Sequence, residues 1–378
     1  MRRLLHIPNN AGGHPSVLSL YLKKVGIKSE SWILKQNYLA YEVDKVLCYL
    51  KDNLILQEIK RLFALRYVFF FHAVFFNYGT GLFNPFPNVN SKRYKNVPRL
   101  IIWLYKKYSF LLAYVETSLL ILMKKPIFIQ YQGDDARQGW YCRKNFKNHF
   151  VFQVPKDYYN DESDLCKKKC IKFYSSRAQK IYSVNPDLLH ILPNNAEFLP
   201  YANVEVQKIS PVYNQLQKQN LRIGHAPTNQ KVKGTKFIID AINSLRSEGF
   251  FVDLVLIENV SNIKAKKLLS DVHIVIDQLF AGWYGGVAVE AMSMGKPVIS
   301  YIRHEDCFHI PKEMFQELPI ISANHKNIKL VLKSLLEIEK LDLLKIAKKS
   351  RLFAEKWHCP LKIAKRIKHD LDIAWRTL

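Results

Sequence analysis

The segment from Asp277 to Ser300 constrains the fold of this chain more than any other. An apolar run leads to Gly285 and Gly286, which are followed by an apolar stretch with helical spacing, by Gly295 and by a second apolar run. This order of strand, glycine-rich turn, helix, tight turn and strand is typical of two parallel strands joined by a crossover helix. The segment therefore predicts an α/β domain with a parallel sheet.

The same alternation extends over the rest of the chain. Short apolar runs between amphipathic stretches predict strands at residues 4–7, 32–34, 67–71, 127–131, 221–224, 252–257, 273–277 and 297–301. A chain of 378 residues suits two domains of moderate size. The polar, Gln-rich segment 203–220, with Pro211, separates two successive α/β units. Because ligands of such sheets bind at the carboxyl ends of the strands, we expect the site in a cleft between the units.

Composition and charge limit the classes of function. The chain has 57 Lys and Arg against 32 Asp and Glu, a formal net charge of +25, and 48% hydrophobic residues. That apolar content excludes a disordered chain. The excess charge favours an anionic partner, which could be nucleic acid, an anionic membrane surface or a phosphorylated substrate. A coding bias of the genome is the alternative explanation for much of the excess.

Targeting and cross-linking signals point to a cytoplasmic protein. The start of the chain lacks the apolar core of a signal peptide. The two most apolar stretches, 67–76 and 109–123, are shorter than the ~20 residues of a membrane-spanning helix. The six cysteines are irregularly spaced and do not suggest a disulfide scaffold. Cys166 and Cys170 would share a helical face, but zinc needs two further ligands, so we predict no metal site.

Glu290 is the charged residue that the pattern explains least easily. It lies inside the apolar start of the helix after Gly285 and Gly286. A buried carboxylate is costly unless it binds something, and the two hydroxyls of a ribose can donate to its two oxygens. The backbone N–H groups at the helix start can hold an anion or a sugar hydroxyl. The alternative is that Glu290 is a partly exposed helix residue without a ligand.

The run Glu290-Ala-Met-Ser-Met-Gly-Lys-Pro-Val-Ile299 resembles the donor-binding region of the GT-B glycosyltransferases, closest to family 4 (glycosyl transferases group 1). In that family a Glu-x7-Glu signature includes the start of the run, and the second glutamate holds the nucleotide ribose. The resemblance assigns this role to Glu290. The first glutamate, which touches the donor sugar, is Gly282 here, and Asp277 could supply a replacement carboxylate.

The stretch His225–Lys236 resembles the first strand, loop and helix of the same donor domain. Lys233 matches the family's diphosphate lysine, since a lysine beside a helix N-terminus offers both a charge and a dipole. Thr228 replaces a family arginine, and Lys231 could compensate; a solvated lysine cluster is the alternative. The predicted donor-binding residues are Glu290, Lys233, Lys231, Thr228, Gly285, Gly286 and Tyr284.

Two segments of the first half are similar to acceptor-side segments of the family. Residues 130–137 follow a predicted strand, where relatives carry a His-Gly-x-Asp-x-Arg-like stretch, and residues 9–14 form a glycine-containing loop that faces the cleft. An aspartate there could act as a base or bind acceptor hydroxyls, or else cap a helix and pair with an arginine. His72 is a further acceptor-side candidate, and for both His14 and His72 a purely structural role is the alternative. The predicted catalytic residues are Asp134, Asp135 and Asp277, and the predicted acceptor-binding residues are Gly12, Gly13, His14, Gln132 and Arg137.

The resemblance implies two Rossmann-like domains (GT-B) facing each other across a cleft, with a helical C-terminal tail. We expect an N-terminal acceptor-side domain over residues 1–205, a linker over 206–220, a donor-binding domain over 221–358 and a helix over 359–378 that returns to the first domain. The tail is expected to be helical from residue 327, with a break before Pro360.

The function implied by the resemblance is transfer of a sugar from a nucleotide-diphosphate sugar to a glycan or lipid-linked acceptor, as in bacterial surface polysaccharide assembly. The reaction would be independent of metal, would need no cofactor beside the nucleotide sugar, and would retain configuration if family 4 chemistry holds. The basic charge suggests a peripheral position on the inner face of the plasma membrane. The alternatives are a sugar-nucleotide epimerase of the same fold, a non-catalytic nucleotide-binding homologue and a nucleic-acid-binding protein. The last would not explain Glu290, so we expect no nucleic-acid partner.

Overall fold

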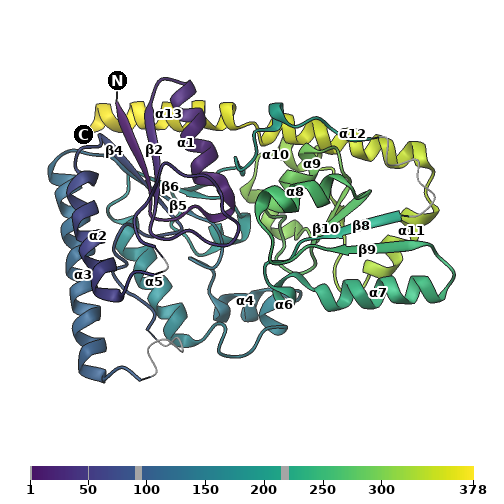
Figure 1. Ribbon diagram of the computed structural model, residues 1–378, viewed down its shortest axis with the longest axis horizontal. Coiled ribbons are helices and arrows are strands. Elements are labelled where there is room, and N and C mark those ends of the chain that lie inside the picture. The colour runs from purple at the N-terminus through teal and green to yellow at the C-terminus, as the bar shows by residue number, and fades with distance from the viewer. Residues whose placement is uncertain (1, 50, 90–95, 214–220) are drawn as a thin grey trace.

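The computed structural model describes residues 2–49, 51–89, 96–213 and 221–378. Its strands form two sheets, a seven-stranded sheet of order β3-β2-β1-β4-β5-β6-β7 and a five-stranded sheet of order β12-β11-β10-β8-β9. Every strand pair is parallel. The predicted class, two parallel α/β units with a helical tail, is thereby confirmed (Figure 1).

The first sheet belongs to the N-terminal half of the chain. Its strands are β1 (Arg3–Ile7), β2 (Lys28–Ile33), β3 (Lys45–Val46), β4 (Ala73–Asn77), β5 (Ile127–Tyr131), β6 (Lys180–Ser183) and β7 (Ala196–Phe198). Its helices are α1 (His14–Lys24), α2 (Leu54–Val68), α3 (Arg99–Leu122), α4 (Gly139–Asn145) and α5 (Asp161–Ser175). Alternation along the buried strands divides the core: Leu5 and Ile7 face α2, α3 and α5, whereas Leu4 faces α1.

The second sheet is built from the C-terminal half. Its strands are β8 (Leu221–His225), β9 (Val252–Leu256), β10 (Ile274–Gln278), β11 (Val298–Ser300) and β12 (Ile321–Ser322). Its helices are α6 (Gln230–Lys233), α7 (Thr235–Ser247), α8 (Asn262–Ser270), α9 (Gly286–Ser293), α10 (Lys312–Gln316), α11 (Ile328–Glu337) and α12 (Lys340–Trp357). Apolar residues of α7 and α11 pack on one face of this sheet, those of α8 and α9 pack on the other, and α12 contributes to both clusters.

The last helix, α13 (Pro360–Thr377), crosses back onto the first sheet (Figure 1). Its buried residues Ile363, Ile367 and Leu371 join Leu4 and Leu18 in one apolar cluster beside α1. The chain therefore ends on the unit in which it began. Of the predicted linker over 206–220, residues 214–220 lie outside the described residues.

One predicted strand is wrong. The apolar run that begins at Tyr67 predicts a strand at 67–71, but Val68 ends helix α2 and the strand of this region is β4. The run joins the end of a helix to a buried strand through a turn, and apolar periodicity alone does not separate the two over so few residues. No helix among the described residues is long and apolar enough to cross a membrane.

Candidate active-site cleft

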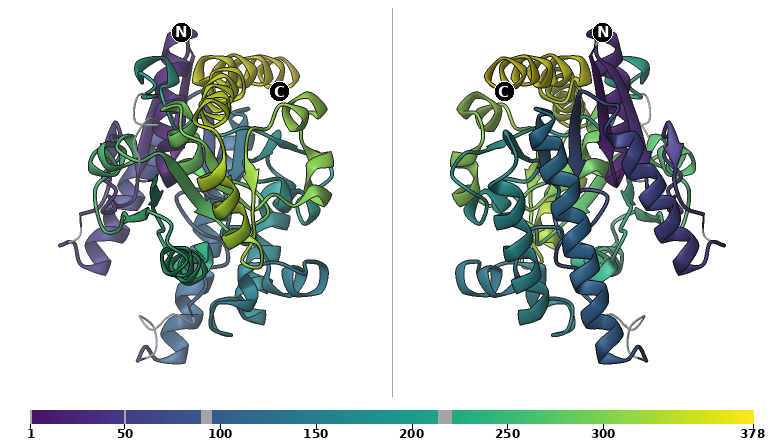
Figure 2. Two further views of the ribbon diagram at one scale, coloured as in Figure 1. Left: turned by 90° about the vertical axis from the view of Figure 1, so that its right-hand side faces the viewer. Right: turned by 90° about the vertical axis from the view of Figure 1, so that its left-hand side faces the viewer.

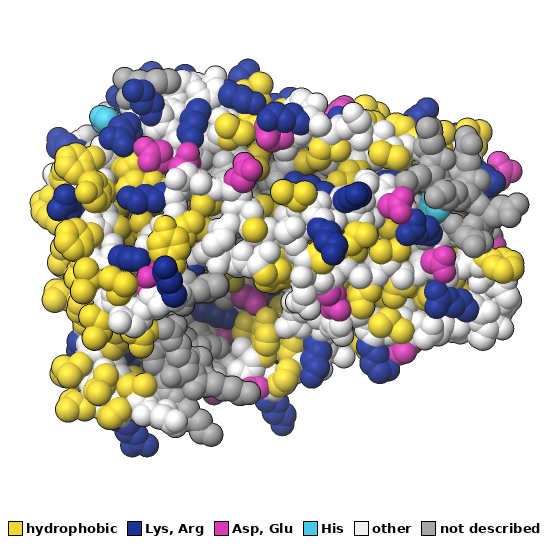
Figure 3. Space-filling model, in the orientation of Figure 1, with side chains coloured by type: hydrophobic (Ala, Val, Ile, Leu, Met, Phe, Trp, Pro, Cys, Tyr) yellow, Lys and Arg dark blue, Asp and Glu magenta, His cyan; other side chains and the backbone are white. Residues whose placement is uncertain are grey.

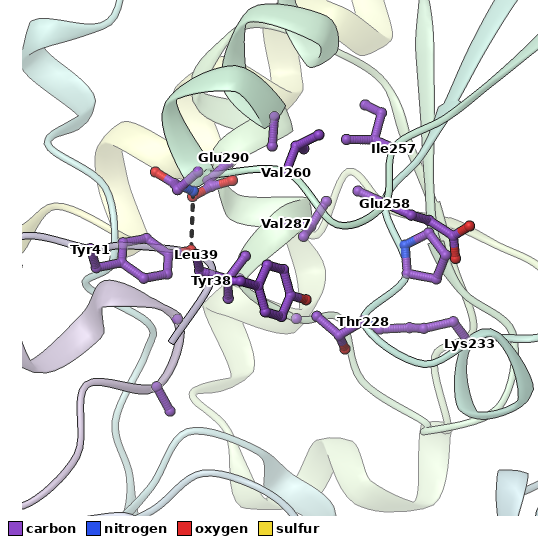
Figure 4. Close-up of a pocket in the computed structure, with 18 of the residues that line it drawn as sticks. Tyr38, Leu39, Tyr41, Thr228, Lys233, Ile257, Glu258, Val260, Val287 and Glu290 are labelled. Atoms are coloured by element: carbon purple, nitrogen blue, oxygen red, sulfur yellow. Dashed lines mark hydrogen bonds between the residues drawn. The ribbon is translucent and has the colours of Figure 1, made fainter. Parts of the chain in front are cut away.

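A cavity of about 310 Å³ lies where the carboxyl ends of the two sheets meet. The first unit contributes loops that follow β1, β2, β4 and β5, and the second contributes loops that follow β8, β9 and β10 together with the start of α9. Figure 4 shows Glu290 and Lys233 at opposite ends of this cavity, with Tyr38 and Val287 between them. Charged side chains of the second unit thus line the cleft that the sequence predicts.

Glu290 lies in the middle of α9 with its side chain almost completely buried. Its Oε1 accepts a hydrogen bond from Asn262 Nδ2 at 2.7 Å and lies 4.0 Å from Lys266 Nζ. Burial raises the pKa of the Glu290 carboxyl, while Lys266 and the bond from Asn262 oppose the rise. This carboxylate lines the cavity, so the hydroxyls of a ligand are suitable donors to it.

Asn262 also ties the first unit to this end of the cavity. Its backbone N–H donates to the carbonyl of Leu39 at 3.1 Å, and its Nδ2 donates to the Tyr41 hydroxyl at 3.1 Å. The Tyr41 ring lies against Gly13, where a Cβ would come within 2.5 Å of the ring. Gly13 has a φ of +75°, so both its backbone and its lack of a side chain suit this position. The loop after β2 therefore covers the Glu290 end of the cleft.

Lys233 ends α6 beside the glycine-rich turn that precedes α9. Its Nζ lies 2.7 Å from Asp277 Oδ1, and Asp277 Oδ2 accepts the backbone N–H of Gly285 at 2.6 Å. A Cβ at Gly285 would lie 3.5 Å from Lys233 Nζ. Because the first N–H groups of a helix lack partners within it, Lys233 and the start of α9 offer a cation and backbone donors that suit an anion.

Asp277 does not face the cavity. Its side chain is 1% exposed, and it lies behind Lys233 and the turn that it orients. Gly282, at the position of the family's first glutamate, has a φ of +84° and packs against Arg303, whose Nη1 would lie 2.6 Å from a Cβ there. Among the described residues that line the cavity, the carboxylates are those of Asp134, Glu258 and Glu290.

The remaining predicted donor residues divide into two groups. Thr228, Gly285 and Gly286 line the cavity. Lys231 does not and is exposed on the outer side of α6, with its backbone N–H bonded to the Asn229 side chain. Tyr284 is completely buried beneath the turn, and its hydroxyl lies 2.9 Å from His358 Nε2.

On the acceptor side, Gly12, Gln132, Gly133 and Asp134 line the cavity. Asp134 Oδ2 accepts from the Tyr158 hydroxyl at 2.7 Å, its Oδ1 accepts from the Tyr159 hydroxyl, and Arg137 Nη1 is 3.4 Å from Oδ1. The Asp134 side chain is nevertheless 38% exposed. An acceptor hydroxyl can therefore reach this carboxylate.

The other predicted residues of this wall are turned inward. Asp135 accepts the N–H groups of Gln132 and Gly133, and burial raises its pKa to about 6 against these bonds. Arg137 is buried in a two-bond pair with Asp187, at 2.8 and 3.3 Å. Asp135 thus caps the loop, and Asp134 pairs with Arg137. A cap combined with a salt bridge is the structural alternative that the sequence left open for this stretch.

The two candidate histidines of this wall do not face the cleft. His14 is completely buried, its Nδ1 accepts the Ala202 N–H at 2.7 Å, and its Nε2 lies 2.9 Å from Gln130 Nε2. Burial lowers the pKa of His14 to about 3, so the ring is neutral. His72 precedes β4 and therefore lies at the amino end of the sheet, opposite the cleft. This position favours the structural role for His72 that the sequence left as the alternative.

Several cavity residues were missed from the sequence. They come from loops and a helix start without a motif and include Tyr38, Leu39, Tyr41, Tyr78, Tyr201, Glu258 and Asn262. Asn262 follows Ser261, which caps α8, and its sequence context indicates only a helix start. Among the described residues, no group of three or more His, Cys, Asp or Glu side chains could hold a metal ion.

Comparison with solved structures places this geometry in a known fold. HepE from Anabaena, solved in complex with UDP-glucose, aligns with a TM-score of 0.59 at 10% identity over 99% of this chain and 100% of its own. Sucrose-phosphate synthase from Thermosynechococcus elongatus aligns with a TM-score of 0.60 at 10% identity over the whole of both chains. This chain has the GT-B fold.

WaaG, a glycosyltransferase involved in lipopolysaccharide biosynthesis, aligns with a TM-score of 0.53 at 11% identity over 97% of this chain and 99% of its own. No protein-family model matches the sequence, and no curated protein matches it. The similarity to GT-B proteins is therefore a similarity of structure. In the sequence, the short motifs around Glu290 and Lys233 indicated this fold.

Proposed function

We propose that this chain is a glycosyltransferase that binds a nucleotide-diphosphate sugar in the cleft and moves its sugar to an acceptor held by the first unit. The observation that carries the proposal is the placement of Glu290 and Lys233 at the two ends of one cavity (Figure 4). A carboxylate at one end and a cation with a helix N-terminus at the other match a ribose and a diphosphate. The fold shared with HepE, which was solved with UDP-glucose, supports this assignment.

The donor would lie along the second unit. Glu290 accepts hydrogen bonds from the ribose hydroxyls, and the apolar side chains of Ile257, Val260 and Leu269 give the base a wall. Lys233 and the first N–H groups of α9 hold the diphosphate. As the glycosidic bond to the diphosphate breaks, negative charge grows on the leaving oxygen, and these fixed groups stabilise it. The proposal assigns this work to the protein rather than to a metal ion.

The acceptor would lie against the first unit, with Asp134 accepting a hydrogen bond from the hydroxyl that is glycosylated. The tyrosines Tyr158 and Tyr159 fix this carboxylate, so the hydroxyl is oriented when it binds. The loop with Tyr38 and Tyr41 closes the cleft from the first unit and limits access of water to the donor. Asp277 is a positioning residue for Lys233, and Arg137 positions Asp134.

The resemblance to family 4 implies retention of configuration, which we include in the proposal. Proton NMR of the product tests it, because the coupling constant of the anomeric proton distinguishes the two anomers of a glucose-type sugar. A product with inverted configuration would reject family 4 chemistry for this cleft.

The proposal is tested by a thermal-shift screen of the purified chain against UDP, GDP, CDP and their sugar conjugates, followed by a transfer assay with the conjugate that binds. We expect one nucleotide class to raise Tm and its sugar to be transferred to a glycan or glycolipid. Conversion of the donor alone, without an acceptor, would identify an epimerase. Binding of nucleotide without turnover would identify a non-catalytic homologue, and salt-sensitive binding of RNA with no nucleotide binding would reject the proposal.

A further inference from the structure

Helix α3 exposes an apolar face and buries a face that includes polar side chains. The face turned to the sheet buries Ala113 and Leu120 together with the polar residues Ser109, Glu116 and Thr117. Glu116 accepts the backbone N–H groups of Leu82 and Phe83 at 3.0 and 3.3 Å. The face turned outward carries Leu100 and Leu122, which are 67% and 77% exposed. A helix that covers a sheet beside water is expected to show the opposite pattern.

Helix α2 adds to the same surface. Its buried residues Ala64, Leu65 and Val68 pack on the sheet, while Ile55 and Phe63 on the other side are 73% and 56% exposed. The two helices face outward together on the side of the first unit that is remote from the second (Figure 2). In the space-filling view, hydrophobic side chains gather along this side (Figure 3). Single exposed apolar residues are ordinary, but an apolar face that spans two helices marks an interaction surface.

A groove of about 760 Å³ runs between the two helices. Its outer walls include Ile59 of α2 and Ile101 of α3, and its inner end reaches Asn9 and Thr80. These two residues belong to the loops after β1 and β4, which also contribute Ala11, Gly12 and Tyr78 to the cleft. The loops after β1 and β4 therefore contribute both to the groove between the helices and to the first unit's side of the cleft.

The exposed charges on the two helices are mainly basic. Each helix contains one acidic residue: Glu58, which is engaged by Arg61 and by the Tyr108 hydroxyl, and the buried Glu116. The basic residues Arg66, Arg99, Lys107 and Lys124 are exposed on or directly after the helices. An apolar face with basic residues around it complements an anionic lipid surface, in which apolar side chains enter the acyl boundary and cations meet headgroups.

We propose that the outer face of α2 and α3 docks on an anionic membrane surface. The exposed leucines and aromatic residues of the two helices enter the interface, with α3 lying in its plane, and the groove between the helices accepts lipid chains. This docking is independent of the donor site. In one respect it rests on the proposed function: an acceptor carried by the same membrane would be presented to Asp134 through the loops that end the groove.

The test is co-sedimentation of the full chain with vesicles of phosphatidylcholine alone or mixed with phosphatidylglycerol. We expect at least tenfold stronger binding to the anionic vesicles, and a loss of at least about tenfold in the triple variant Leu100→Gln, Leu104→Gln, Leu111→Gln. These three residues are all more than half exposed, so the substitutions leave the core unchanged. The control variant Phe251→Gln, Leu330→Gln, Leu352→Gln removes three apolar residues of the second unit that are also more than half exposed, and it should bind as the unaltered chain does.

Two readouts keep the outcomes distinct. The nucleotide-induced thermal shift of both variants should equal that of the unaltered chain, since neither variant touches the cleft. A chain that binds vesicles but no nucleotide would reject the proposed function and leave the docking intact. An unaltered chain that ignores vesicles, or a triple variant that binds them undiminished, would overturn the docking. So would a dimer in sedimentation velocity that the triple variant dissolves, because a second copy would then cover the face.

Discussion

The two walls of the cleft use their charged residues in opposite ways. On the second unit, Glu290 and Lys233 reach the cavity, and the groups behind them, Asn262 and Asp277, hold them there. On the first unit, the pair of Arg137 and Asp187 is turned inward, and Asp134 is the carboxylate that reaches the cavity from the residues described there. One wall presents a carboxylate and a cation that buried partners hold in place, and the other is a scaffold that presents one carboxylate.

The difference indicates where each kind of specificity would arise. Fixed charges on the second unit favour a donor with invariant chemical groups, a ribose and a diphosphate. The first unit offers shape, loop backbone and one hydrogen-bond acceptor, which suits acceptors that differ between enzymes of one fold. Substitutions on the two walls should therefore change different measured quantities.

The largest effect is expected for Arg137→Met on the first unit. It leaves the Asp187 side chain, which is 1% exposed, without its partner, so the free energy of unfolding should fall by about 3–5 kcal/mol. Urea denaturation measures the change. Arg222→Met breaks the exposed pair with Asp271 and serves as the control, with an expected loss below about 1 kcal/mol. Equal losses in both variants would show that the Arg137 pair does not support the acceptor wall.

Asp135 should make stability depend on pH. Its folded pKa of about 6 is raised above the ordinary value of 3.8, so the folded state holds the proton more tightly and the contribution to stability is complete below about pH 4. As pH rises through about 6, the free energy of unfolding should fall by up to about 3 kcal/mol. Asp135→Asn should remove this part of the slope, as measured by urea denaturation between pH 4 and 7. Asp240→Asn, on the exposed side of α7, should leave the slope unaltered.

Asp134→Asn should separate catalysis from donor binding. Replacement of the carboxylate weakens the hydrogen bond to the acceptor hydroxyl, so kcat/KM for the acceptor should fall about 10- to 100-fold while the nucleotide Kd stays constant. Steady-state kinetics and calorimetry measure the two quantities on one preparation. A nucleotide Kd that changes as much as kcat/KM would place Asp134 on the donor instead.

Lys233→Met should weaken nucleotide binding about tenfold or more, because it removes a cation from the diphosphate. Lys231→Met, two residues away and outside the cavity, is the matched control and should bind as the unaltered chain does. Since Lys233 also neutralises the buried Asp277, the double variant Lys233→Met, Asp277→Asn should regain stability without regaining affinity. Equal affinity losses in Lys231→Met and Lys233→Met would indicate that the general positive charge near the cleft, rather than a specific contact of Lys233, attracts the nucleotide.

The sequence predicted the donor wall better than the acceptor wall for a physical reason. Glu290 and Lys233 each belong to one strand–turn–helix unit, in which spacing over some ten residues fixes the side chain relative to the cleft. Asp134 depends on Tyr158 and Tyr159, more than twenty residues away, and His14 depends on Gln130 and Ala202. Contacts of that range follow from the tertiary fold and leave no local pattern.

Most of the strands were predictable because buried parallel strands appear in a sequence as short apolar runs. The orientation of helix α3 was not predictable in the same way. The run 109–123 is one of the two most apolar stretches of the sequence, whereas the structure buries Glu116 of this run and exposes Leu122. Periodicity in the sequence shows that a helix has two faces, but packing against the sheet determines which face is buried.

The contact between Glu290 and a ribose tests the central claim most directly. Calorimetry would compare the nucleotide diphosphate that the screen selects with its 2′,3′-dideoxy analogue, on the unaltered chain and on Glu290→Gln. We predict that the unaltered chain binds the ribonucleotide about tenfold or more tightly than the analogue, and that the ratio falls close to one in the variant. The same ratio in both proteins would show that Glu290 does not hold the ribose, and would contradict the donor site described for this cleft.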